Sequence, residues 1–306
     1  MKKILVATVK PFAPDAVTGI KDICKSAGYD LTVLEKYDGQ DALIEAVKDA
    51  NGLIIRSDKV TAEVINAAEN LEVVVRAGAG YDNVDLEVAT KNNVVVMNTP
   101  GQNSNAVAEL ALGMMVYLVR GGFNGKSGTE LKGKTIGIHA YGNVGQNVAR
   151  IAKGFGMEVY AFDPFIDRAE IEADGVKAVT SVETLYETCQ YVSLHIPSNE
   201  KTKASIGTAL LSKMPKNAVL VNTARKEVIN EKELMEIFAE RDDFSYVSDI
   251  APDCADDIAA KYEGRYFFTP KKMGAQTKEA NVGAGIAAIN QIKGLWENGD
   301  KTFQVN

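Results

Sequence analysis

Strand-length apolar runs that alternate with helix-length segments are the feature that most constrains the fold of this chain. Five such runs lie in the first 100 residues, at Lys2–Val9, Asp30–Glu35, Gly52–Ser57, Leu71–Ala77 and Asn93–Asn98. They are rich in valine and isoleucine and lack the polar alternation of a half-exposed strand. Strands of this kind, separated by helices, predict a parallel sheet that is covered on both faces.

A second series of strands begins after a long helix predicted at Asn103–Arg120. Its strands are predicted at Lys132–Ala140, Met157–Asp163, Tyr191–Pro197, Ala218–Ala224, Phe244–Ile250 and Arg265–Pro270. A length of 306 residues suits two domains. A last helix at Thr277–Trp296 can return to the first series and make that domain discontinuous. We therefore expect an α/β protein with two doubly wound parallel-sheet domains, one of residues 1–100 plus 283–306 and one of 101–282.

Composition and charge exclude several classes of protein. The net charge of −7 argues against nucleic acid or an anionic membrane as the main partner, and no run of 18 apolar residues predicts a membrane span. Cys24, Cys189 and Cys254 form neither a disulfide framework nor a metal-ligand spacing. This use of cysteine is typical of a reducing compartment, so we expect a cytoplasmic protein without a metal.

The turn after the strand that ends near His139 resembles a dinucleotide-binding fingerprint. The pattern G-x-G-x-x-G is represented by Ala140, Gly142 and Gly145, with alanine in the first place. Asp163 ends the next strand about 20 residues later, where a carboxylate accepts hydrogen bonds from the adenosine ribose. That carboxylate repels a 2′-phosphate, so NAD is expected rather than NADP. The predicted cofactor loop consists of Tyr141, Gly142, Asn143, Val144 and Gly145. The alternative is an ordinary glycine-containing turn, with Asp163 as a loop starter before Pro164.

Longer motifs, in a fixed order, carry a more specific resemblance. They are Arg76–Asp85, Asn98–Glu109, the nucleotide loop, Ser193–Pro197 and Asn222–Asn230. Through them the chain resembles the D-isomer-specific 2-hydroxyacid dehydrogenases over nearly its whole length. The resemblance implies a central Rossmann-like NAD domain and a smaller flavodoxin-like substrate domain made of both chain ends. It also implies a homodimer built on the helix near Asn103–Arg120.

Within that family the chain is most similar to the D-3-phosphoglycerate dehydrogenases, which begin serine biosynthesis by oxidising a phosphorylated 2-hydroxy acid. The likeness places Arg56 and Ser57 near the substrate phosphate. It places the substrate carboxylate on the backbone amides of Ala77, Gly78, Ala79 and Gly80, with Asn103 and Ser104 lining the same site. The chain ends soon after Trp296, as in the short form that lacks a serine-sensing domain.

The resemblance also assigns catalytic and cofactor residues. Arg225 matches the family arginine, whose planar fork can bind a carboxylate and polarise the C2 oxygen. Asp249 matches the acid that holds the nicotinamide carboxamide. The remaining matched cofactor positions are His195, Pro197, Thr223 and Ala224.

Three positions depart from the family pattern around Arg225. Lys226 stands where glycine is usual, and the usual glutamate and histidine are missing. Lys271 or Lys272 takes the histidine place, depending on whether the segment is aligned from Thr269–Pro270 or from Gly274. We therefore expect a lysine acid/base, and leave open which of the two it is. Asp253 is a weak candidate for the missing acid, and a buried structural role is expected for His139.

Two other functions stay open from the sequence. The first is a different D-2-hydroxy-acid oxidoreductase, such as a hydroxypyruvate or glyoxylate reductase. The second is a non-enzymatic NAD-sensing protein, because fold alone does not fix function. Arg225 and the paired lysines argue against the second alternative.

Overall fold

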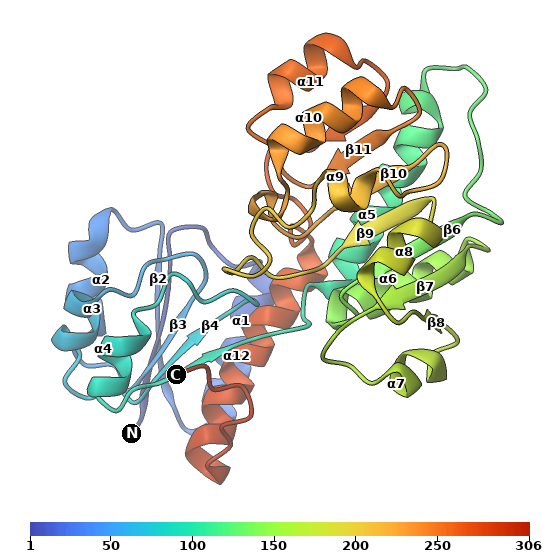
Figure 1. Cartoon of the computed structure of the whole chain (residues 1–306). Coiled ribbons are helices and arrows are strands. Elements are labelled where there is room, and N and C mark those ends of the chain that lie inside the picture. Colours follow the sequence, from blue (N-terminus) through green and yellow to red (C-terminus); the bar gives the residue numbers. More distant parts are fainter. The chain divides into compact units, whose positions relative to one another are not determined.

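The computed structural model describes all 306 residues, and they form two compact units (Figure 1). One unit comprises Met1–Asn103 together with Gln276–Asn306, and the other comprises Ser104–Ala275. Residues 101–103 and 276–282, which the sequence analysis assigned to the central domain, lie in the unit that contains both chain ends. Each unit is built on one fully parallel sheet. The predicted α/β fold class is confirmed.

The unit that contains both chain ends has a five-stranded sheet in the order β2-β1-β3-β4-β5. Its strands are β1 (Lys3–Thr8), β2 (Asp30–Glu35), β3 (Gly52–Ile55), β4 (Val73–Arg76) and β5 (Val95–Asn98). Its helices are α1 (Pro14–Ala27), α2 (Gly39–Val47), α3 (Ala62–Ala67), α4 (Leu86–Lys91) and α12 (Lys278–Asn298). This strand order is the flavodoxin-like one, as the resemblance implied.

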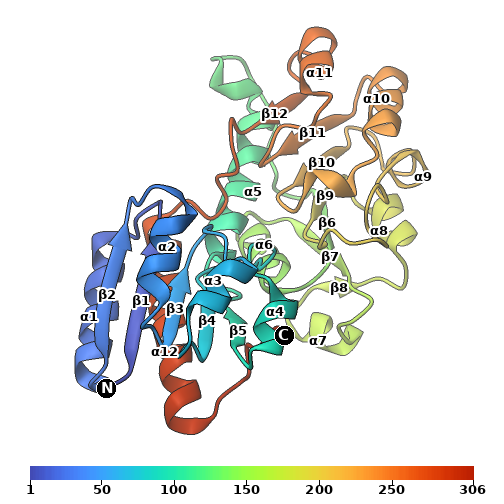
Figure 2. The same cartoon turned by 90° about the vertical axis from the view of Figure 1, so that its left-hand side faces the viewer.

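Both faces of this sheet are covered, as its continuous apolar strands require (Figure 2). On one face the core includes Leu43 of α2 and Val64 of α3. On the other it includes Ile20 of α1 and Ile289 of α12. The last helix thus completes the core of a domain whose strands were formed at the start of the chain.

The second unit has a seven-stranded sheet in the order β12-β11-β10-β9-β6-β7-β8. Its strands are β6 (Thr135–His139), β7 (Glu158–Phe162), β8 (Lys177–Ala178), β9 (Tyr191–Leu194), β10 (Val219–Asn222), β11 (Ser245–Ser248) and β12 (Tyr266–Phe268). Its helical segments are α5 (Ser104–Val119), η1 (Gly121–Phe123), α6 (Asn143–Gly154), α7 (Arg168–Ala173), α8 (Val182–Thr188), α9 (Thr208–Leu211), η2 (Lys226–Val228), α10 (Glu231–Glu240) and α11 (Ala255–Lys261). None of the helices in the chain is both long and apolar enough to span a membrane.

The strand order of this second sheet reverses direction between β6 and β9. It is the Rossmann order with one added strand, and such sheets bind ligands beyond the carboxyl ends of the strands at the reversal. The residues that follow β6 and β9 begin at Ala140 and His195. The fold therefore brings the predicted cofactor loop and His195 to one edge of the sheet.

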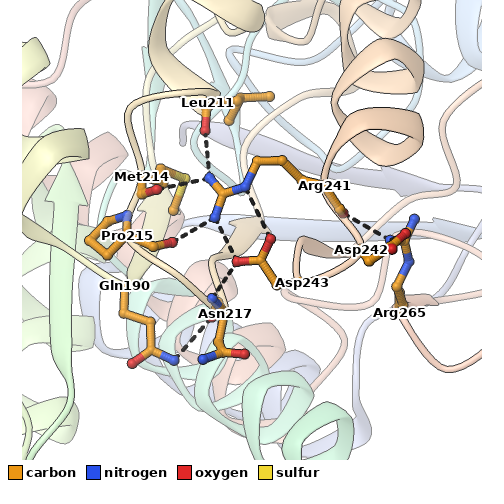
Figure 3. Close-up of polar contacts among 9 residues, drawn as sticks. All are labelled: Gln190, Leu211, Met214, Pro215, Asn217, Arg241, Asp242, Asp243 and Arg265. Atoms are coloured by element: carbon orange, nitrogen blue, oxygen red, sulfur yellow. Dashed lines mark hydrogen bonds and ion pairs between the residues drawn. The ribbon is translucent and has the colours of Figure 1, made fainter.

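At the opposite end of this sheet, where the strands begin, Arg241 follows α10 and forms a network of hydrogen bonds (Figure 3). Its guanidinium donates hydrogen bonds to the carbonyl oxygens of Leu211, Met214 and Pro215 and to the carboxylate of Asp243. The other carboxylate contact of Asp243 is the Asn217 amide at 2.6 Å. These residues precede β10 and β11, so the network holds the amino ends of the strands and has a structural role.

Candidate active site

The cofactor loop joins β6 to α6 through a backbone conformation that favours glycine. Ala140 has φ +79°, in the left-handed region, at the place where the fingerprint has its first glycine. Gly142 is the N-cap of α6, so the free amides of the first helical turn, at Asn143 and Val144, follow it directly. The loop has the geometry of an anion-binding turn, in spite of the alanine.

The two glycines of the loop meet different surroundings. A Cβ atom on Gly145 would lie 2.3 Å from the Ala140 oxygen and 2.9 Å from Ile138 Cγ2, so helix packing against the strand requires glycine there. A Cβ atom on Gly142 would meet nothing within 4 Å. The space in front of Gly142 is therefore open at the helix N-terminus, where a dinucleotide pyrophosphate would lie. The residues present fit a dinucleotide.

Asp163 follows β7 and supports the loop as well as facing the candidate site. One carboxylate oxygen accepts the Tyr141 amide at 2.8 Å, and the other accepts the Phe165 amide at 2.8 Å. Each oxygen keeps a second lone pair for a ribose hydroxyl. Phe165 is 94% exposed beside this carboxylate, which leaves its ring open to a ligand. Phe165 is a candidate that the sequence analysis did not single out.

Tyr141 can contribute to a cofactor site only through its backbone. Its side chain is 1% exposed, and its hydroxyl donates to Asp174 at 2.9 Å. The ring therefore anchors the loop to the residue that follows α7.

Both histidines are held as neutral rings. His195 Nε2 lies 2.9 Å from Ser193 Oγ, and its Nδ1 lies 3.4 Å from Thr223 Oγ1. Burial, with a smaller contribution from His139, lowers the pKa of His195 to about 3. His139 lies 3.2 Å from the Tyr186 hydroxyl, and burial lowers its pKa to about 4. Neither ring suits an acid/base at neutral pH.

Arg225 and Lys272 are brought together at one carbonyl oxygen. Arg225 follows β10 in an extended conformation with φ −141°. Its Nη1 donates to the Ala224 oxygen at 3.0 Å, and Lys272 Nζ donates to the same oxygen at 3.1 Å. Lys271 has no such contact with this loop. The structure therefore associates Lys272, of the two lysines, with Arg225.

The segment that carries the lysines is held by Asp249. This carboxylate is 2% exposed and accepts hydrogen bonds from the amides of Met273 and Gly274, each at 2.7 Å, and from Thr269 Oγ1 at 3.1 Å. A Cβ atom on Gly274 would lie 2.8 Å from Asp249 Oδ2, so this close approach requires glycine. Asp249 was expected to hold the nicotinamide; what the structure shows is that both of its oxygens bind the loop that ends in Gly274.

Asp253, the weak candidate for the missing acid, forms an ion pair with Lys226. Lys226 is the residue that stands in place of the usual glycine after Arg225, so Asp253 is paired with a residue directly next to Arg225. Both residues are more than a quarter exposed, with side-chain exposures of 32% for Lys226 and 79% for Asp253. The pair lies beside the Arg225 loop, and Asp253 has a lysine partner other than Lys271 or Lys272.

In the other unit, two arginines stand at the carboxyl ends of neighbouring strands. Arg56 Nη1 donates to the oxygens of Lys10 and Pro11, and burial lowers the pKa of Arg56. Arg76 Nε donates to the Arg56 oxygen at 3.0 Å. Ser57 is exposed next to them. Arg76 was not proposed from the sequence, although its place at a strand end beside Arg56 is visible there.

The Ala77–Gly80 loop presents fewer amides than the sequence analysis expected. The Ala77 amide donates to Ile55 O, and the Gly78 amide donates to Arg76 O, each at 2.8 Å. Gly78 has φ +152°, a conformation that requires glycine. Only the amides of Ala79 and Gly80 remain for an anion, because the backbone itself uses the other two.

The other predicted site residues lie at the ends of these elements. Pro197 is exposed in the loop after β9, and Thr223 is buried after β10. Asn103 immediately precedes α5, and Ser104 is its first residue and is 2% exposed. No group of three or more histidine, cysteine, aspartate or glutamate side chains is arranged to hold a metal ion.

Comparison with known proteins gives a consistent family. A family model described as "D-isomer specific 2-hydroxyacid dehydrogenase, NAD binding domain" matches residues 114–254. A D-3-phosphoglycerate dehydrogenase of Methanocaldococcus jannaschii is 37% identical over 83% of this chain, which spans 51% of that protein. A hydroxypyruvate reductase of Thermotoga maritima is 35% identical over 86% of this chain and 90% of that protein. The chain thus spans about half the length of several D-3-phosphoglycerate dehydrogenases that it matches, including those of the rat and of humans.

A solved structure is similar over the full length. It is the NAD⁺-bound 3-phosphoglycerate dehydrogenase of Entamoeba histolytica, with a TM-score of 0.87 and 46% sequence identity. The match covers 100% of this chain and 98% of that one.

Proposed function

Because the chain belongs to the D-isomer-specific 2-hydroxyacid dehydrogenase family, we propose that it moves a hydride between NAD and a D-2-hydroxy acid. The substrate we propose is D-3-phosphoglycerate, which is oxidised to 3-phosphohydroxypyruvate. The observation that carries the proposal is the placement of Arg225 Nη1 and Lys272 Nζ on one oxygen, that of Ala224. A 2-hydroxy acid has a carboxylate and a C2 oxygen on adjacent carbons. Two neighbouring cations can therefore bind these two groups, with Arg225 at the carboxylate and Lys272 at the C2 oxygen.

Cofactor binding falls to the loop after β6. The open space at Gly142 would hold the pyrophosphate, to which the first amides of α6 would donate. Asp163 would accept the adenosine ribose hydroxyls and disfavour a 2′-phosphate. Phe165, exposed next to this carboxylate, would be free to contact the adenine. When bound, NAD supplies the hydride acceptor, and every other contribution comes from the chain itself.

Catalysis divides between the two cations. Arg225 binds the carboxylate and polarises the C2 oxygen through its planar fork. Lys272 accepts the hydroxyl proton during oxidation and returns it during reduction. Asp249 holds the segment that carries Lys272. In the other unit, Arg56, Arg76 and Ser57 are the proposed ligands of the substrate phosphate. The amides of Ala79 and Gly80 are proposed to bind the carboxylate of the substrate.

The two units correspond to the domains of the family. We assign Met1–Asn103 with Gln276–Asn306 to substrate binding and Ser104–Ala275 to NAD binding. Gly113 of α5 is exposed, and Tyr117, one turn further along, packs edge-on against Phe123, which is 65% exposed. We assign this apolar face to a homodimer contact, which light scattering can test. The three free cysteines suit the cytoplasm.

A hydroxypyruvate reductase is the second candidate, because the relative with that name is matched over 90% of its length. The substrates of the two candidate functions differ in the phosphate group, for which Arg56 and Arg76 are the proposed ligands. Steady-state assays with NAD should compare D-3-phosphoglycerate with D-glycerate, the same acid without phosphate. We expect kcat/KM to be higher for the phosphorylated acid by about 10- to 100-fold, the value of one charge-assisted hydrogen bond. Equal or better use of D-glycerate would favour the second candidate.

Arg56→Ala tests the phosphate assignment directly. It should raise KM for D-3-phosphoglycerate by about 10- to 100-fold and change the KM for D-glycerate far less. An equal loss with both acids would make Arg56 a structural residue.

A further inference from the structure

The loop that carries Arg225 is organised by one buried side chain, Asn222, the last residue of β10. Asn222 is 1% exposed, so its amide touches neither solvent nor a ligand. Its Oδ1 accepts the Ala224 amide at 2.9 Å, and its Nδ2 donates to the Arg225 oxygen at 3.0 Å. The second Nδ2 proton faces the Tyr246 hydroxyl at 3.2 Å. The side-chain amide of Asn222 thus forms three hydrogen bonds, two with peptide groups of the loop and one with the Tyr246 hydroxyl of the neighbouring strand.

The two peptides that Asn222 holds lie on either side of a third one. The Ala224 amide belongs to the peptide before it, and the Arg225 oxygen belongs to the peptide after it. Between them lies the Ala224–Arg225 peptide, whose oxygen accepts both Arg225 Nη1 and Lys272 Nζ. Fixing both neighbours fixes the direction of the central oxygen, because the backbone has only two soft torsions per residue.

The backbone of Asn222 ties the same loop to the next strand. Its carbonyl oxygen accepts the Asp249 amide at 2.9 Å and Ser248 Oγ at 3.2 Å. Asp249 in turn holds the Met273 and Gly274 amides, directly after Lys272. Two chains of hydrogen bonds therefore connect Asn222 to the two cations. One passes through Ala224, and the other passes through Asp249 to the segment that follows Lys272.

We propose that Asn222 is a positioning residue for the reaction, whose amide aims the Ala224 oxygen so that Arg225 and Lys272 meet one substrate. The inference rests on the proposed function for the roles of these two cations. Asn222 acts through them and contacts no reacting atom. Its amide chemistry is essential because one group must both accept a hydrogen bond from the chain and donate one to it.

Asn222→Asp tests the proposal with almost no change in shape. The carboxylate still accepts the Ala224 amide, but it cannot donate to the Arg225 oxygen and places a second oxygen against it. Ser248→Ala is the matched control, because it removes another buried hydrogen bond to Asn222 and leaves the amide intact. Asn222→Ser is a second variant, in case the buried charge prevents folding.

The measurements separate positioning from simple stability. We expect Asn222→Asp to lower kcat and raise KM for the hydroxy acid, with a loss in kcat/KM of about 10- to 100-fold, since a misplacement of about 1 Å can cost that much. The KM for NAD should rise far less than that for the hydroxy acid, because the loop after β6, which is proposed to hold the pyrophosphate, is untouched. Ser248→Ala should keep near-normal kcat with a comparable fall in melting temperature. Equal kinetic losses in the two variants at equal melting temperatures would overturn the proposal.

Binding of oxalate distinguishes a failure of this inference from a failure of the proposed function. Oxalate is a planar dianion that resembles the carboxylate and C2 oxygen of a 2-keto acid, and calorimetry measures its binding to the NADH complex without turnover. We expect Asn222→Asp and Asn222→Ser to weaken oxalate by about tenfold or more, the value of one charge-assisted hydrogen bond. Unchanged oxalate affinity in an active enzyme would overturn the positioning role alone. If the Asn222 variants weaken oxalate binding but the unaltered protein oxidises no D-2-hydroxy acid, the proposed function alone would be overturned.

Discussion

At the scale of single residues, the cofactor loop shows how far a sequence pattern can be interpreted. In this pattern the first position forms the tight turn, the second lets the pyrophosphate approach and the third lets the helix pack on the strand. The chain has Ala140, Gly142 and Gly145 at these positions. The structure separates them: Ala140 has a left-handed backbone, Gly145 is packed against Ala140, and Gly142 faces open space. The contacts of Gly145 are with Ala140 and Ile138, a few residues earlier in the chain, so the tight turn and the close helix packing could be predicted from the local pattern.

Ala140→Gly and Gly142→Ala should have opposite effects. The first relieves a left-handed alanine and should stabilise the protein by about 1 kcal/mol, raising the melting temperature by about 2–4 °C. The second adds a methyl group where nothing lies within 4 Å. It should leave the melting temperature unchanged and weaken NAD binding, measured by calorimetry. A Gly142→Ala protein with normal NAD affinity would place the pyrophosphate elsewhere.

The pH dependence of oxidation should reflect a lysine. Burial lowers the pKa of His195 to about 3 and that of His139 to about 4, so neither ring changes charge between pH 5 and 9. A lysine must be neutral to accept a proton, and its ordinary pKa is about 10.4. We expect kcat for oxidation to rise with pH into the alkaline range. An ascending limb centred near pH 6.5 would point to histidine instead.

At the scale of elements, the central strands were predictable, whereas the contacts of the loop that carries the paired lysines were not. Buried apolar runs marked the central strands, because a parallel sheet covered on both faces leaves little choice of residue. The two-residue strand Lys177–Ala178 at the sheet edge was not predicted, since it buries too little to leave a pattern. The choice between Lys271 and Lys272 depends on how Asp249 binds Met273 and Gly274, a contact between segments about 25 residues apart. No local pattern contains that information.

The network at the amino ends of β10 and β11 makes a prediction about stability (Figure 3). The Arg241 guanidinium lowers the pKa of Asp243 in the folded protein. A lowered pKa contributes stability above the unfolded value, about 3.9, and that contribution is lost as the pH falls through the folded value. Asp243→Asn should therefore destabilise the protein at pH 7 by about 1 kcal/mol, a value that allows for partial exposure to solvent.

Denaturant unfolding measures this effect, and Asp242→Asn is its matched control. Asp242 is the adjacent acid, fully exposed and 3.8 Å from Arg265, so its loss should have little effect at any pH. The difference between Asp243→Asn and the unaltered protein should fade below about pH 4. A difference that does not shrink at all as the pH falls below about 4 would mean that Asp243 acts by packing or by hydrogen bonds that do not depend on charge.

At the scale of the whole molecule, two parallel sheets with different strand orders divide the chemistry. The alternation of strands and helices predicted both sheets, and the motif order predicted which unit carries the cofactor loop. The net charge of −7 gives no hint of the cations at the candidate site, because a global charge averages over local clusters. Only the folded chain brings Arg225 and Lys272 to one oxygen across 47 residues of sequence.

Cofactor choice is also a property of the whole site. The first basic residue after Asp163 is Arg168, whose guanidinium is taken by the Ala178 oxygen and by Glu172. No cation lies among the four residues that directly follow Asp163, so kcat/KM should be much higher with NAD than with NADP. Equal efficiency with the two cofactors would contradict the assignment of Asp163.

The most direct test of the account is kcat for oxidation of D-3-phosphoglycerate by Lys272→Ala beside Lys271→Ala. Lys272 shares the Ala224 oxygen with Arg225, and Lys271 does not. Lys272→Ala should lose about 10²- to 10⁴-fold in kcat, as for removal of a general acid–base group, whereas Lys271→Ala should change mainly the KM. Near-normal kcat in both variants, or loss of turnover in His195→Asn instead, would contradict a lysine-based dehydrogenase.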